Sequence, residues 1–152
     1  YGSVKINTDG AHKRDSSKAG SKAGSGGVFR DYQGHVLGAF SANLDVPCAV
    51  HAEVLAVIKA IEPAWLHTWH NVWIEIDSLL VTKLFRSPHL VPWLLRVDWQ
   101  NCLHRLQHMS FKISHIFRKG NHAADALANH GVLGSGLIWW DTAPSFILPF
   151  CQ

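Results

Sequence analysis

The feature that most constrains the fold of this chain is a change in the spacing of its apolar residues, from the alternation of strands to the spacing of helices. Apolar and polar residues alternate in three early segments, which predicts β-strands at residues 3–9, 26–31 and 35–44. The last two are separated only by Tyr-Gln-Gly at residues 32–34, which is typical of a tight turn. The sequence therefore predicts three antiparallel strands at its start.

Helical spacing takes over at residues 49–61, and Pro63 is expected to end or kink this helix. Strands separated by helices pair in parallel, so the later part predicts a mixed α/β sheet with helices between its strands. The later elements, in order, are a strand at 71–77, a short helix at 78–85, a longer helix at 92–107, a strand at 111–117 and a helix at 121–130 with Asn121 as its N-cap.

Length and composition are those of one globular domain over residues 1–152, with its core at 3–131 and a tail at 132–152. The chain is 47% apolar and only 16% charged. No apolar run approaches the ~20 residues of a membrane span and no secretory leader is visible, so we expect an intracellular protein, nuclear or cytoplasmic, without a membrane partner. The first residue is not Met, which we interpret as a fragment of a larger protein. The three cysteines are widely spaced, which favours free thiols.

Four acids occupy special places in this pattern. Asp9 and Asp77 are predicted to end strands, with an Asp-Gly turn as the alternative for Asp9 and a helix cap as the alternative for Asp77. Glu53 has only apolar neighbours one helical turn away, so it must be neutralised unless it bends sideways to solvent. Asp125 lies early in the last helix, where the dipole favours an acid in any case.

These acids are informative as a group because adjacent parallel strands bring their carboxyl ends together. Two carboxylates ~4 Å apart repel by about 4 kcal/mol at an effective dielectric constant near 20, so a cluster of four requires compensating cations. Oxygen-only sites suit Mg²⁺ or Mn²⁺, and paired ions of this kind support in-line phosphodiester hydrolysis.

Five motifs, KINTDGA, GGVFRDYQG, AEVLAVIKAI, WIEIDSLLV and SHIFRKGNHAADALANHG, occur in the order in which the ribonuclease H family has them. Over residues 4–131 the chain resembles this family, most closely the plant branch at the end of non-LTR retrotransposon polyproteins. The tail motif SFILPF resembles that branch too. The resemblance implies a mixed five-stranded sheet with helices on both faces, and hydrolysis of the RNA strand of RNA/DNA hybrids.

The resemblance also implies site residues and partners. Catalytic and metal-binding roles fall on Asp9, Glu53, Asp77 and Asp125, which would hold two Mg²⁺ ions, with Mn²⁺ able to substitute. The partners would be an RNA/DNA hybrid and a reverse transcriptase domain in the same parent polypeptide. We expect substrate contacts from eight further residues: Gly10, Ala11, Lys13, Arg14, Ser78, Arg118, Asn121 and His122.

The chain departs from the family at two places. The catalytic His of bacterial and animal members lies on a longer loop than the one here, and Arg118 and His122 are the candidates to replace it in part. The positions where the family reads the minor groove with amide side chains hold Ala49, Val50 and Leu79. The alternative function is therefore a catalytically weak or inactive nucleic-acid-binding module derived from a retroelement.

Two other readings are less favoured. His104 and His108 are one helical turn apart, but no third and fourth zinc ligand is near them in the sequence. Trp93 is expected in the core, with a nucleic-acid groove as the alternative.

The loop over residues 12–22 carries four cations, and we expect it to be mobile and to contact phosphates.

Overall fold

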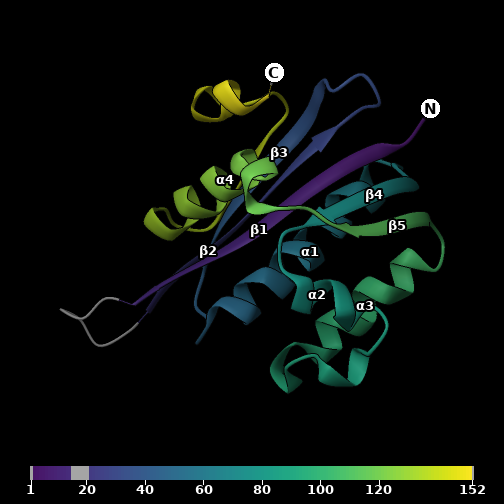
Figure 1. Cartoon of the computed structure of the whole chain (residues 1–152), viewed down its shortest axis with the longest axis vertical. Coiled ribbons are helices and arrows are strands. Elements are labelled where there is room, and N and C mark those ends of the chain that lie inside the picture. The colour runs from purple at the N-terminus through teal and green to yellow at the C-terminus, as the bar shows by residue number, and fades with distance from the viewer. Residues whose placement is uncertain (1, 15–20, 152) are drawn as a thin grey trace.

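A computed structural model of the chain describes residues 2–14 and 21–151. It contains a mixed sheet of six strands in the order β5-β4-β1-β2-β3-β6 (Figure 1). The strands are β1 (Val4–Arg14), β2 (Ser21–Arg30), β3 (Val36–Leu44), β4 (Asn71–Ile76), β5 (Ser110–His115) and β6 (Leu137–Trp140). The pairs β1–β2 and β2–β3 are antiparallel, whereas β4 pairs in parallel with β1 and β5. The predicted mixed sheet is confirmed, but the count of five strands was one short, because β6 in the tail adds to β3.

The helices are α1 (Ala49–Leu66), α2 (Leu79–Leu84), α3 (Arg96–Leu106) and α4 (His122–Leu133). Short 3₁₀ turns are η1 (Pro88–Leu90), η2 (Trp93–Leu95), η3 (Arg118–Gly120) and η4 (Ser145–Phe150). Pro63 was expected to end or kink the first helix, and it does not end it, since α1 continues to Leu66. The helix expected from residue 92 begins at Arg96, after η2.

The two longest helices cover opposite faces of the sheet (Figure 1). A Cβ atom on Gly10 of β1 would meet the backbone of α1, whereas one on Gly24 or Gly26 of β2 would meet α4. Gly10 pairs with Ser25, so these two residues face the same side of the sheet, whereas Gly24 and Gly26, on either side of Ser25, face the other. These glycines let both helices lie close to the strands.

The opening hairpin is longer than the sequence indicated. Strand β1 continues past Asp9 to Arg14, so the prediction that it ends at Asp9 was wrong, and β2 begins at Ser21 rather than at residue 26. Lys13 pairs directly with Lys22 in this ladder, although both were assigned to a loop. Lys18 lies outside the described residues.

The main core lies between the sheet and α1 to α3, where Trp99, Phe29 and Ile61 are fully buried. Trp93 is 75% exposed, so the expectation that it belongs to the core was wrong. All three cysteines are free thiols, as predicted. Within the described ranges, no helix combines the length and apolar character that crossing a membrane requires.

Candidate metal centre

Asp9 and Asp77 become neighbours because β1 runs on where β4 stops. Thr8 and Ile76 are the last paired residues of this parallel ladder, and each is followed by one of the two acids. Asp9 is 0% exposed in the middle of β1, whereas Asp77 immediately follows β4. The expectation that two strand positions bring these acids together is confirmed, but only one of them is a strand end.

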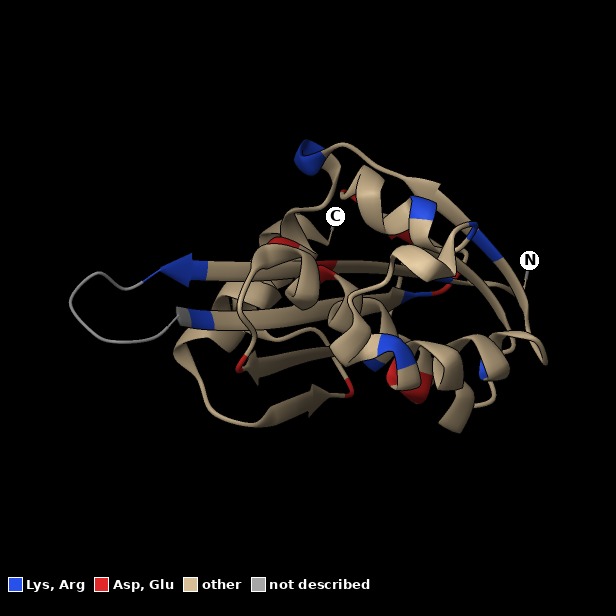
Figure 2. Ribbon diagram, turned by 90° about the horizontal axis from the view of Figure 1, so that it is seen from below, with Lys and Arg blue, Asp and Glu red and all other residues tan. Residues whose placement is uncertain are grey.

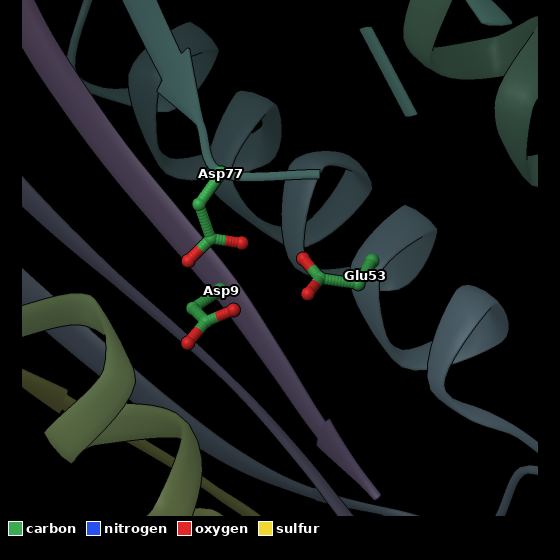
Figure 3. Close-up of side chains that lie close together, drawn as sticks. All are labelled: Asp9, Glu53 and Asp77. Carbon is green, nitrogen blue, oxygen red and sulfur yellow. The ribbon is translucent and has the colours of Figure 1, made fainter. Parts of the chain in front are cut away.

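Glu53 reaches the same place from the second turn of α1. Ligand oxygens of Asp9, Glu53 and Asp77 lie within 4.8 Å of one another, and the three side chains point toward a common space (Figure 3). Each acid comes from a different element, so the cluster forms only when β1, α1 and β4 are assembled.

The cluster is short of positive charge and of hydrogen-bond donors. Oδ2 of Asp9 and Oε2 of Glu53 are buried without a hydrogen-bond partner. No ion pair joins any of the three acids to a Lys or Arg within the part of the chain that the structure describes. Buried polar groups are almost always paired, so these orphaned oxygens fit a site for hard divalent cations.

The pKa values of Asp9 and Glu53 are both raised, as expected for buried acids that lack a positive partner. Burial raises the pKa of Asp9 from its ordinary value of 3.8 to about 10, and the charges of Glu53 and Asp77 add to this. Burial also raises the pKa of Glu53 from 4.5 to about 7, while the positive charge of Arg118 acts in the opposite direction. Without a cation, the two carboxyl groups therefore favour their protonated forms, and a bound cation would displace those protons.

Asp125 lies beside the cluster but outside the group of three. Its position in the first turn of α4 is confirmed, and it contributes to the raised pKa of Asp9. Nδ2 of Asn129 donates to Oδ1 of Asp125 at 3.3 Å. The structure thus brings three of the four predicted acids together and holds the fourth close to Asp9.

Asn121 occupies the N-cap position that the sequence predicts, but its side chain is used for tertiary contacts. It is the N-cap residue of α4, but its side chain makes no capping hydrogen bond. Instead its Nδ2 donates to the Thr8 carbonyl at 3.0 Å and to Oδ2 of Asp77 at 3.2 Å. Sequence reasoning missed this because the N-cap preference for Asn explained the residue without a tertiary contact.

The remaining predicted contact residues surround the site unequally. Ser78 caps α2 by accepting from the Val81 amide at 3.3 Å. Gly10 is buried against α1, and Ala11 is half-buried beside it. Four cationic or titratable side chains are exposed: Lys13, Arg14, Arg118 and His122.

A zinc site finds no support in the described residues. His104 and His108 lie with their ring centroids 5.4 Å apart, but they have no further ligand close by. The carboxylate cluster is the one group of three metal-ligating side chains that the described ranges contain.

Comparison with known proteins shows the family to which this chain belongs. The model of the family described as reverse transcriptase-like matches residues 7–131. The Arabidopsis thaliana protein named "Putative ribonuclease H protein At1g65750" is 32% identical over 155 residues, which cover 94% of this chain. They cover only 23% of that relative, so the chain spans about a quarter of its length.

Solved structures show the same fold. RNase H1 from Halobacterium salinarum has a TM-score of 0.71 and 25% identity over 84% of this chain and 96% of its own. LC11-RNase H1 in complex with an RNA/DNA hybrid has a TM-score of 0.71 and 24% identity, over 85% of this chain and 96% of its own. The foamy viral protease-reverse transcriptase, also in complex with a hybrid, has a TM-score of 0.71 and 24% identity over 86% of this chain and 20% of its own. With the family match and these folds, the chain belongs to the reverse transcriptase-like branch of the ribonuclease H family.

Proposed function

We propose that this domain hydrolyses the RNA strand of RNA/DNA hybrids with the help of two divalent cations. The observation that carries the proposal is the cluster of Asp9, Glu53 and Asp77, with ligand oxygens within 4.8 Å and two of them orphaned. Three converging acids repel one another, so the cluster does not stabilise the folded domain. A site that binds cations for phosphodiester hydrolysis requires such a cluster.

The four acids have distinct roles in this proposal. Asp9 and Asp77 are the central metal ligands. Glu53 would bind one ion on the side of the substrate 2′-hydroxyl, and Asp125 would hold the ion on the side of the attacking water. When bound, the Mg²⁺ or Mn²⁺ ions supply charge neutralisation and a more acidic water. The chain itself fixes the carboxylates in place and keeps Asp9 fully shielded from bulk water.

Exposed cations near the site favour a polyanionic substrate. Lys13 and Lys22 face each other across the β1–β2 ladder, and such a pair of like charges is unfavourable unless an anion binds between them. Figure 2 shows Lys and Arg at the ends of these strands, where the hairpin projects from the domain. Arg118 and Lys119 form a second exposed pair in η3.

The grip on the hybrid is weak in this proposal. Phosphate contacts alone do not distinguish RNA from DNA, and Ala49 and Leu79 offer no side-chain donors although both are exposed. We infer slow cleavage with a high KM by the isolated domain. A polymerase-like domain of the same parent polypeptide would then deliver the substrate.

Incubation of micromolar domain with a labelled hybrid and Mg²⁺ or Mn²⁺ tests the proposal. We expect cleavage of the RNA strand that chelator abolishes. Salt-sensitive binding without cleavage would favour the rival function, a nucleic-acid-binding module that has lost turnover.

A further inference from the structure

A chain of buried side-chain hydrogen bonds begins at the carboxylate of Asp77. Asn121 is its first member, and its Nδ2 uses both protons, one on Oδ2 of Asp77 and one on the Thr8 carbonyl. Its Oδ1 accepts from Nδ2 of Asn7 at 3.1 Å. Thr8 is the last β1 residue paired with β4, so Asn121 ties β1 to Asp77 at the point where the ladder ends.

Asn7 continues the chain on β1. Its Nδ2 also donates to Oε1 of Glu75 at 3.2 Å, and its Oδ1 accepts from Nη1 of Arg30 at 3.3 Å. Asn7 is 3% exposed and Asn121 is 1% exposed. Every amide proton and both amide oxygens have a partner, which fixes the orientation of both side chains.

Both outer ends of the network are anchored. Glu75 forms an ion pair of 2.8 Å with Nζ of Lys5. At the other end, Nη2 of Arg30 donates to the Phe150 carbonyl in η4 at 3.4 Å. The tail is itself held by Ile147, which is fully buried.

We propose that Asn7 and Asn121 are positioning residues for the metal-binding carboxylates, and that the C-terminal turn η4 braces them through Arg30. The inference rests on the proposed function, because it gives Asp77 a cation to hold. The two amides act through Asp77 and Thr8 rather than on the substrate. Without them, the carboxylate of Asp77 would be free to turn away from two neighbouring acids of like charge.

The first test uses the unaltered domain. Side-chain amide signals of Asn7 and Asn121 are followed by ¹⁵N NMR as Mg²⁺ is added, with Asn43 as the matched control. Asn43 donates to the Gly131 carbonyl at 3.0 Å and holds β3 to the end of α4. We expect the first two amides to shift on one saturation curve while Asn43 stays unmoved.

Two outcomes of this titration would overturn the inference in different ways. Unmoved Asn7 and Asn121 amides beside a responding Asp77 backbone signal would refute the positioning role alone. A domain in which no signal responds to Mg²⁺ would refute the proposed function, and the positioning role with it.

The second test compares the Mn²⁺ affinity of Asn121→Ala, Asn7→Ala and Asn43→Ala by electron paramagnetic resonance. Substituting an outer residue that orients a metal ligand typically weakens affinity by about 10- to 100-fold, and we expect that loss for Asn121→Ala. Asn7→Ala should lose less, and Asn43→Ala should match the wild type. In hybrid cleavage, kcat should fall for Asn121→Ala while KM stays unchanged.

The tail is tested by Arg30→Gln and by deleting residues 149–152, which removes the Phe150 carbonyl but keeps Ile147. Both changes should weaken Mn²⁺ binding in the same direction as Asn7→Ala. Equal Mn²⁺ affinity for Asn121→Ala and Asn43→Ala would overturn the positioning role of Asn121. An Arg30→Gln variant that binds Mn²⁺ like the wild type would overturn the role of Arg30 and η4. If Asn121→Ala does not fold, the NMR titration of the unaltered domain decides.

Discussion

Gly10 lies so close to Glu53 that a Cβ atom on Gly10 would stand 2.4 Å from the Glu53 amide nitrogen. The glycine after Asp9 therefore serves close packing between β1 and α1. It does not form a turn, because β1 continues to Arg14. This contact places the Glu53 carboxylate next to Asp9.

Gly10→Ala should destabilise the domain by about 1 to 3 kcal/mol or more, because the new methyl group has only backbone atoms to displace. Gly134→Ala is the milder control, since its new Cβ would stand 3.3 Å from the His130 carbonyl oxygen, a tight contact that a shift of a few tenths of an ångström relieves. Urea unfolding of both variants measures the difference. Equal stability would show that α1 can retreat from β1 without cost.

Asp77→Asn should abolish cleavage and leave the metal-free domain folded with an equal or higher melting temperature, because it removes one of three clustered negative charges. Each kcal/mol gained raises the Tm of a domain of this size by roughly 2 to 4 °C. Thermal unfolding in chelator is the measurement. A clear drop in Tm would mean that the carboxylate is needed for structure rather than for metal binding.

Stability of the metal-free domain should fall as the pH rises. The folded-state pKa of Asp9, about 10, lies above its ordinary 3.8, so its contribution is fully present below about pH 4 and is lost as the pH rises toward 10. Glu53 adds the same trend between 4.5 and about 7. Urea unfolding in chelator across this range should show the decline, and Mg²⁺ should remove it. The Asp9→Asn, Glu53→Gln double variant is the control, and a slope equal to that of the wild type would assign the effect to other groups.

Replacing Lys13 and Lys22 with Thr should lower the salt dependence of hybrid binding by roughly one unit of slope for each lost phosphate contact. Lys59→Gln on α1 is the matched control. Fluorescence anisotropy at several salt concentrations gives the slopes. An unchanged slope would show that the hairpin cations are solvated without touching the substrate.

Ala49→Asn and Leu79→Asn should lower KM more than they change kcat, since they add hydrogen bonds made equally by the ground state and the transition state. Both side chains are exposed, whereas Val50 packs partly against the core and is a poorer choice. Steady-state cleavage of a hybrid measures both constants. If the unmodified domain already prefers hybrid to duplex DNA strongly, backbone groups near Gly10 carry the discrimination.

Much of the fold was predictable because strong periodicity and local signals agree. The alternation that marked β4 and the helical spacing that marked α1 placed Asp77 and Glu53 correctly. The ends of β1 and β2 were missed because Lys, Ser and Gly there resemble a loop. Their strand structure comes from pairing across the ladder, which composition does not reveal.

The carboxylate cluster was predictable as a set of residues, whereas the network behind it was not. Asn7 lies on the polar side of an alternating strand and Asn121 fits a helix cap, so local rules explain both residues without a tertiary contact. Their shared hydrogen bond spans 114 positions in the sequence, and only the assembled sheet brings them together. Strand β6 was missed because its four residues are partnered only by β3.

The chemical identity of the ends produced from a hybrid tests the central claim most directly. Attack by water at a cation-binding carboxylate site leaves a 3′-hydroxyl and a 5′-phosphate, whereas attack by the neighbouring 2′-hydroxyl leaves a cyclic phosphate. We predict that the domain with Mg²⁺ or Mn²⁺ cuts only the RNA strand and leaves 5′-phosphates. The Asp77→Asn variant should lack this activity. Cyclic phosphate ends, or equal activity in the Asp77→Asn variant, would contradict the account.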